Sequence, residues 1–416
     1  MGNKEKSSYE LGIVVLLALL WGIVIMNRLA IVYLFPFIID EFKISYAQAG
    51  ALTSILALTF AFSTWFSGGL SDRVGRKIVL IPATIFFSIM SWFSGLSHSF
   101  VQMVLVRGLM GIGQGSVLPA SVATIAAESN PNRRGFNFGL HQALAPLIAV
   151  GLGAILVTQL TRIMSWRMVF FMVGVPGLII TIILYFYMRE PRPLLFEQGG
   201  ERSETTAEKP GFFAPLKCRN VILSSIVNSL MMCCMFVFAA FGIVYLTKEL
   251  YLSVSRAGII MSLLGFTGFG GCILLPLLSD YIGRKKVIIP SLFVTGLCFL
   301  GFMSCGSNYF LLALLIAIAG FGIGGIAPIA IAALTTESVE PSLAATASGI
   351  PVSFGEIFGG ALMPLVAGYF ADIYGLKATL YFSAVAPLIG GLVALCYEET
   401  APRILDRKLA LGVNKY

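Results

Sequence analysis

Charged residues are scarce in this sequence. Among its 416 residues only 12% are Asp, Glu, Lys or Arg, whereas 57% are hydrophobic, and the mean hydropathy is +0.90. A soluble domain carries roughly 25% charged residues, which keep its surface hydrated. So small a share of charge cannot cover the surface of a water-soluble fold, and the composition therefore excludes an ordinary soluble protein.

Sequence patterns for metals, nucleotides and covalent catalysis are also missing. The seven cysteines form no CxxC pair and have no metal-ligand spacing, so we interpret them as small packing residues. Two glycine-rich runs, 108–115 and 320–325, follow no predicted strand, and they indicate close helix packing instead of a nucleotide loop. No nucleophile stands in a recognisable pattern with a base. The sequence predicts a protein that is not an enzyme and has no metal or cofactor.

Long apolar blocks, in contrast, fill most of the chain. Each is long enough to cross a bilayer as a helix, which takes about 20 residues, and none shows the alternation that a membrane barrel requires. We predict an all-α polytopic membrane protein with twelve transmembrane helices in two pseudo-symmetric six-helix bundles. The expected spans are 11–38, 47–69, 77–96, 99–126, 135–160, 166–188, 220–246, 256–278, 286–305, 309–335, 343–371 and 376–397.

One long polar stretch, 189–219, divides these blocks into six and six. It is rich in Pro, Gly, Ser and Thr and poor in apolar residues, which predicts a mobile linker. The predicted domains are an N-terminal bundle at 1–188, a cytoplasmic linker at 189–219 and a C-terminal bundle at 220–416.

The net charge of +8 has an uneven distribution across the predicted loops. Twenty Lys and Arg lie on the side that holds the N-terminus, and six lie on the other side. Cytoplasmic loops carry the excess of positive charge in membrane proteins. We therefore expect both termini in the cytoplasm, an integral plasma (inner) membrane location, and anionic lipid rather than nucleic acid as the partner of this charge.

The two halves of the chain repeat each other. Residues 68–77 (GGLSDRVGRK) recur as 276–285 (PLLSDYIGRK), and the segment 113–129 recurs as 322–338 with the same spacing of Gly, Pro and Glu-Ser. These offsets fall at corresponding spans, so the halves run in the same direction. Parallel repeats are typical of transporters that rock one bundle against the other around a central site.

The repeated loop carries a family resemblance. The run Asp72-Arg73-Val74-Gly75-Arg76-Lys77 after the second span, with its echo at 280–285 after the eighth, resembles the signature loop of the major facilitator superfamily. Within that superfamily, Asn27-Arg28 followed by Pro36, and the run 107–115 (RGLMGIGQG) followed by Pro119, resemble the branch of anion:cation symporters. The resemblance implies a carrier of organic acids that works by alternating access.

The signature loop is open to two interpretations. Its basic residues orient the chain in the membrane, and its carboxylate can also meet a helix N-terminus or an arginine on a neighbouring helix. The resemblance implies that it acts as a conformational latch that holds the outward-facing state and does not touch the substrate. The candidate latch residues are Asp72, Arg73, Gly75, Arg76, Arg134, Asp280 and Arg284.

Two arginines, Arg28 and Arg107, fall at similar depths inside the predicted membrane region. Arg28 lies about 26 Å along its span from the N-terminal side, and Arg107 lies about 12 Å from the opposite edge, at 1.5 Å per residue. Buried arginine requires a partner or a cavity. Either they bond to backbone carbonyls as structural groups, or they bind a carboxylate, whose geometry fits the guanidinium fork. The resemblance favours the second possibility, because arginines at these positions coordinate the anionic substrate in that branch.

Acids are missing where the resembled branch often has them. Asn27 precedes Arg28, and Gln114 lies seven residues after Arg107; both amides can hydrogen-bond a substrate but cannot carry a proton. One acid, Glu356, remains near the middle of a span. It is either a neutral structural group or the coupling residue for a proton, and a sodium site using the same carboxylate is equally allowed.

Tyr33 and Asn228 are weaker candidates for contacts with the substrate. Together these residues predict a secondary active transporter, driven by protons, for a small organic anion such as a monocarboxylate or a sugar acid. The alternatives are a drug or metabolite efflux antiporter of the same fold and an uncoupled organic-anion uniporter. We expect a monomer whose partners are the anion and the bilayer.

Overall fold

The computed structural model describes residues 3–130, 133–189, 214–340 and 343–404. Within these ranges twelve helices are long and apolar enough to cross a membrane, as predicted, and no strand occurs. The N-terminal half consists of α1 (Asn3–Phe42), α2 (Tyr46–Val74), α3 (Arg76–Gly95), α4 (Phe100–Glu128), α5 (Arg134–Ala145), η1 (Pro146–Leu152), α6 (Gly153–Leu160) and α7 (Trp166–Tyr187). The short turn η2 (Ala214–Lys217) precedes the second half.

The C-terminal half repeats this order. It consists of α8 (Arg219–Lys248), α9 (Val254–Ile282), α10 (Arg284–Ser304), α11 (Tyr309–Ala327), η3 (Pro328–Ala333), α12 (Leu334–Glu337), α13 (Ala344–Phe354), η5 (Gly355–Leu362), α14 (Met363–Tyr374) and α15 (Lys377–Ala394). The short pieces belong to single spans: α5, η1 and α6 form the fifth, α11 to α12 the tenth, and α13 to α14 the eleventh.

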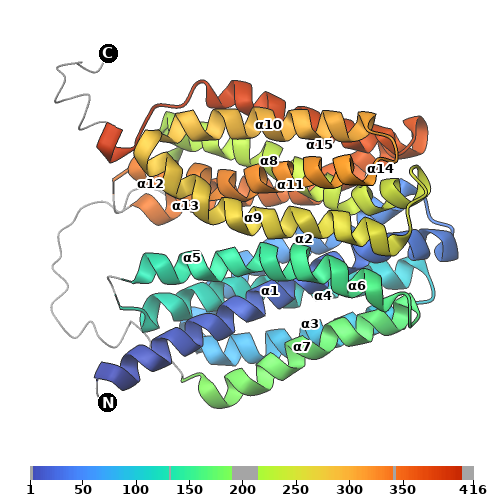
Figure 1. Cartoon of the computed structure of the whole chain (residues 1–416). Coiled ribbons are helices and arrows are strands. Elements are labelled where there is room, and N and C mark those ends of the chain that lie inside the picture. The colour runs from blue at the N-terminus through green and yellow to red at the C-terminus, as the bar shows by residue number, and fades with distance from the viewer. Residues whose placement is uncertain (1–2, 131–132, 190–213, 341–342, 405–416) are drawn as a thin grey trace.

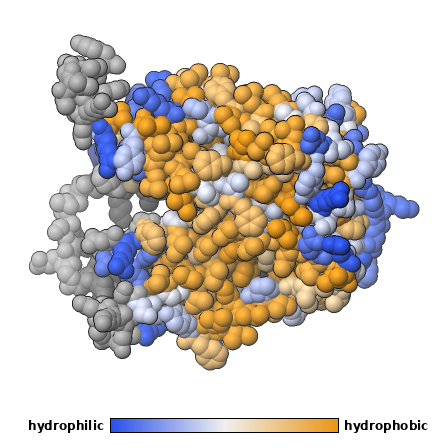
Figure 2. All heavy atoms as spheres, viewed as in Figure 1, coloured by the Kyte–Doolittle hydropathy of each residue, from blue (hydrophilic) through white to orange (hydrophobic). Residues whose placement is uncertain are grey.

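The two halves lie side by side as two helical bundles (Figure 1). We call the end of the molecule where α1 begins and α7 ends the terminal end, and the opposite end the distal end. On the face shown in Figure 2, hydrophilic residues gather at these two ends, and apolar residues cover the region between them. This distribution suits a bilayer, whose hydrocarbon core is about 30 Å thick.

Several predicted spans are shorter than the helices that contain them. The first span, predicted at 11–38, belongs to a helix that extends from Asn3 to Phe42, and the second, predicted to end at 69, continues to Val74. Hydropathy marks only the apolar part of a helix, whereas the backbone continues into the polar region beyond the hydrocarbon. The repeated loops end α2 and α9 in the same way: Gly75 and Gly283, which follow these helices, have φ of 109° and 110°, a conformation that an L side chain rarely adopts.

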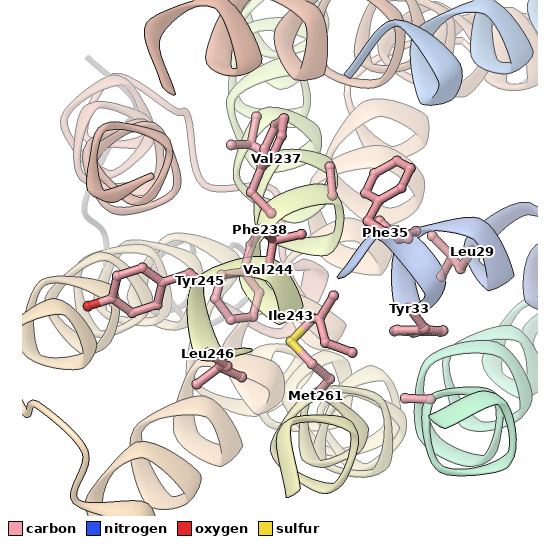
Figure 3. Close-up of a cluster of buried hydrophobic side chains, with 14 of the residues drawn as sticks. Leu29, Tyr33, Phe35, Val237, Phe238, Ile243, Val244, Tyr245, Leu246 and Met261 are labelled. Carbon is pink, nitrogen blue, oxygen red and sulfur yellow. The ribbon is translucent and has the colours of Figure 1, made fainter. Parts of the chain in front are cut away.

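The halves meet through their middle and distal segments. α2 packs on α14 and η5, α9 packs on η1 and α6, and α1 packs on α8. A buried apolar cluster joins α1, α8 and α9, and Figure 3 shows Leu29, Tyr33, Ile243, Val244 and Met261 among its members. This packing closes the distal side of the interface between the halves.

The terminal side of the same interface is open. At the distal side, a methyl group added to Gly50 or Gly368 would clash with the backbone of the opposite half. Gly139 of α5 and Gly349 of α13, in the terminal halves of the corresponding spans, have open space at that position. The main packing partners of α13 are elements of its own half. The molecule is therefore closed at its distal end and open toward its terminal end.

Candidate functional site

An ion pair joins the two halves near the middle of the molecule. Nη2 of Arg28, on α1, lies 2.9 Å from Oε2 of Glu356, and the two residues are 328 positions apart. The side chains are 6% and 18% exposed, so the pair is largely shielded from water. We call Arg28 and Glu356 the interface pair. It brings together the cation of one half and the acid of the other, both of which the sequence singled out.

Glu356 lies where the winding of the eleventh span changes from α-helical to π-helical. The π-helical turn η5 begins at Gly355, and such turns occur often at functional sites. A side chain at Gly359 would clash with Met232 and with the backbone of Cys233 on α8. The glycine therefore lets η5 lie directly against α8, and this contact places the Glu356 carboxylate beside α1.

Two phenylalanines enclose the guanidinium of Arg28. The ring centroid of Phe60, on α2, lies 5.1 Å from Cζ, and that of Phe236, on α8, lies 4.7 Å from it. Each half contributes one ring, and an aromatic face attracts a cation most strongly where water is excluded. Sequence reasoning missed both residues, since 32 phenylalanines in an apolar chain offer no signal that distinguishes two of them.

A small cavity of about 10 Å³ lies beside the interface pair. This volume holds roughly one water molecule, so a substrate can enter only if the halves separate further. Residues of both halves line the cavity: Arg28, Leu29, Val32, Thr53, Arg107, Phe236, Ala239 and Ala240.

Arg107 lines the same cavity but has different partners. Its Nη2 donates to the carbonyl of Arg28 at 2.7 Å, and its Nη1 lies 3.5 Å from the carbonyl of Asn27. The side chain is fully buried. Backbone carbonyls of α1 thus engage Nη1 and Nη2, as the structural alternative for Arg107 predicts, whereas its Nε is buried and has no partner among the described residues. The contacts with the carbonyls also fix the segment of α1 that presents Arg28.

The two amides that replace acids point into the N-terminal bundle. Nδ2 of Asn27 donates to the carbonyls of Ile23 and Val173, and Nε2 of Gln114 donates to that of Val24. Their side-chain oxygens, Oδ1 and Oε1, are buried and have no hydrogen-bond partner within the described residues. Neither amide lines the cavity.

The remaining candidates also lie away from the cavity. Tyr33 is buried in the apolar cluster of Figure 3, and Nδ2 of Asn228 donates to the carbonyl of Pro351 at 2.7 Å. His141 stacks on Trp21, with ring centroids 5.9 Å apart. In this closed-cavity arrangement, only Arg28, Arg107 and Glu356 of the predicted site are brought together.

The candidate latch is described fully in the C-terminal half. Arg284 pairs with Asp280 at 2.6 Å and with Glu337 of α12 at 2.8 Å. In the N-terminal half, Arg76 is buried next to Gly75. The side chains of Asp72, Arg73 and Arg134 lie outside the described residues.

Polar contacts between the halves mark the distal closure, and the sequence did not predict them. Asp372, at the end of α14, accepts hydrogen bonds from the backbone amides of Tyr46 and Ala47 at 2.7 and 2.9 Å, and so caps the N-terminus of α2. Gln159 of α6 donates to Ser255 of α9 at 2.6 Å. A third contact joins Lys248 and Asp40. Together these contacts hold the distal ends of the bundles together.

Metal chemistry has no support from the side chains. Among the described residues, no group of three or more His, Cys, Asp or Glu side chains could hold a metal ion.

The arrangement of twelve helices in two repeated halves that run in the same direction is typical of membrane transporters. The sequence profile of the Major Facilitator Superfamily matches residues 17–357 and 245–411, so the chain belongs to this family. It is therefore a multi-pass membrane transporter and not an enzyme.

Curated relatives are similar at modest identity. A probable 4-methylmuconolactone transporter of Cupriavidus pinatubonensis is 26% identical over 79% of this chain and 76% of its own length. A hexuronate transporter of Bacillus subtilis is 26% identical over 65% of both chains. A multidrug resistance protein, MdtG of Salmonella arizonae, is 26% identical over 83% of both.

Solved structures share the fold. A bacterial homologue of the human lysosomal transporter Spinster superposes with a TM-score of 0.74 over 94% of this chain and 98% of that one, at 20% identity. This likeness confirms the predicted two-bundle architecture.

Proposed function

We propose that the protein is a proton-coupled symporter of small organic anions. The interface pair is the observation that carries the proposal: a guanidinium that could bind a carboxylate is held by the protein's own carboxylate, across the surface along which the halves move. Two relatives are named as a probable transporter of 4-methylmuconolactone and as a transporter of hexuronate, and these names also favour an organic acid as the substrate.

Charge balance explains how the interface pair couples binding of the anion to uptake of a proton. One guanidinium balances one carboxylate, and an extra charge in a site shielded from water costs several kcal/mol. When the substrate carboxylate binds the guanidinium of Arg28, it displaces Glu356 from this guanidinium. Uptake of one proton by Glu356 then offsets the charge that the substrate brings. Anion and proton then cross together, and the net charge of the site, to which Arg107 also contributes, stays unchanged.

The open side of the molecule sets the direction of access. The terminal end carries the excess of Lys and Arg, which we assign to the cytoplasm. In this orientation the described state is closed to the outside and its loosely packed side faces the cytoplasm, and the halves must separate further there before a substrate reaches the site. Rocking of the halves would break the distal contacts of Asp372, Gln159 and Lys248 and close the terminal side.

Two other functions have support of their own. The similarity to MdtG favours efflux of drugs or metabolites. The amides at Asn27 and Gln114, where the resembled branch often has acids, favour a uniporter without proton coupling. Neither alternative predicts that an organic acid accumulates together with protons through Glu356: a uniporter only equilibrates its substrate, and an efflux antiporter moves substrate and proton in opposite directions.

The test is transport by purified protein in liposomes with an imposed pH gradient. We expect wild-type protein to accumulate an organic acid, and Glu356→Gln to lose accumulation while it still exchanges labelled for unlabelled anion. Arg28→Gln should lose both activities. If Glu356→Gln accumulates the anion like wild type, proton coupling through this residue is wrong.

A further inference from the structure

We infer that the site selects carboxylates with an apolar or aromatic body and rejects polyhydroxylated acids. The inference rests on the proposed function and names its substrate class. It follows from what lines the cavity beside the interface pair.

The cavity offers a substrate one anchoring charge and an apolar wall. Apart from Arg28 and Arg107, its lining consists of Leu29, Val32, Thr53, Phe236, Ala239 and Ala240. Nη1 and Nη2 of Arg107 already contact backbone carbonyls of α1, and its Nε alone is buried without a partner among the described residues. Arg28 becomes the main anchor for the carboxylate once Glu356 is displaced, and the body of the substrate must lie against carbon.

Thr53 carries the one hydroxyl group of the described cavity lining, and it donates to the carbonyl of Gly50 in its own helix. The side-chain oxygens of Asn27 and Gln114, which are unpaired within the described residues, belong to residues that do not line the cavity. The lining therefore offers few partners for the hydroxyls of a sugar acid.

Unsatisfied hydroxyls carry a large penalty in affinity. Each hydroxyl buried without a partner weakens binding by about ten-fold. An apolar ring pays no such penalty, and it gains contact with the faces of Phe60 and Phe236, which already lie 5.1 and 4.7 Å from the guanidinium carbon. Planar rings prefer offset contact with such faces.

A matched pair of ligands tests the inference. Cyclohexanecarboxylate and quinate share the ring and the carboxylate, and quinate adds four hydroxyl groups; benzoate and gluconate extend the comparison. The melting temperature of the purified full-length protein is measured at increasing ligand concentration. The concentration that gives half of the maximal rise in melting temperature is compared between the ligands. We expect cyclohexanecarboxylate and benzoate to act at concentrations at least about ten-fold lower than quinate and gluconate.

One variant changes the apolar lining of the cavity and leaves its charged residues in place. Ala240→Ser adds a hydroxyl to the cavity and should reduce the difference between cyclohexanecarboxylate and quinate. Ile226→Thr adds a hydroxyl to the same helix at an exposed position and should leave the difference unchanged.

The outcomes separate the inference from the function on which it rests. If quinate or gluconate binds as tightly as cyclohexanecarboxylate, and Arg28→Gln abolishes that binding, the inference is wrong and the proposed function stands. If no carboxylate binds, or if binding persists in Arg28→Gln, the proposed anion site is wrong and the inference falls with it.

Discussion

Arg28 and Arg107 lie at similar depths but have different surroundings. Helical rise predicted the depths from the sequence, because each residue adds 1.5 Å along a span. The partners could not be predicted, since they depend on how each helix is turned toward its neighbours. Glu356 reaches Arg28 from 328 positions away, and the carbonyls of α1 reach Arg107. The sequence thus identified the charged groups of the site but not their pairing.

The different surroundings predict different effects of substitution. Arg107→Met removes the hydrogen bonds that this buried cation donates to the carbonyls of Asn27 and Arg28, at about 1.5–3 kcal/mol for each bond. Arg28→Met leaves Glu356 without its partner, but Glu356 is partly exposed and can take up a proton. We expect Arg107→Met to lower the melting temperature of the purified protein more than Arg28→Met does, whereas Arg28→Met abolishes carboxylate binding. A larger loss of stability in Arg28→Met would contradict these roles.

At the scale of helices, hydropathy and the internal repeat predicted the number of spans and their order. They did not predict the π-helical turn η5, which depends on the approach of α8 to Gly359. The distal closure was also missed. Asp372 stands at the polar end of its span, and only the folded chain places it at the N-terminus of α2.

The cap that Asp372 provides predicts a shift between states. A carboxylate at a helix N-terminus contributes up to about 1 kcal/mol at an exposed position, so Asp372→Asn should raise the population of the distally open state up to about five-fold. Spin labels at positions 139 and 349, which face open space, would measure this change. The variant should gain a population with a shorter distance between the labels.

A carboxylate at the same end provides the control for this measurement. Glu249→Gln removes a charge beside the distal closure, and within the described structure Glu249 accepts no hydrogen bond from the opposite half. It should leave the distances between the labels unchanged. Equal effects of the two variants, or none of Asp372→Asn, would show that the cap does not hold the closed state.

For the whole molecule, the two halves contribute unequal charges to one site. The N-terminal half supplies Arg28 and Arg107, and the C-terminal half supplies Glu356. The pair therefore breaks or forms as the bundles move, and any anion that binds Arg28 must compete with Glu356. This competition is the central claim, because it ties binding of the substrate to the charge on a residue of the opposite half.

Proton uptake upon binding tests the competition most directly. Purified protein in weakly buffered solution near neutral pH is mixed with a carboxylate that it binds, and a pH indicator reports the protons removed from solution. The account predicts close to one proton taken up for each anion bound by wild type, and none by Glu356→Gln, which still binds. Binding by wild type without proton uptake, or with a requirement for sodium instead, would contradict it.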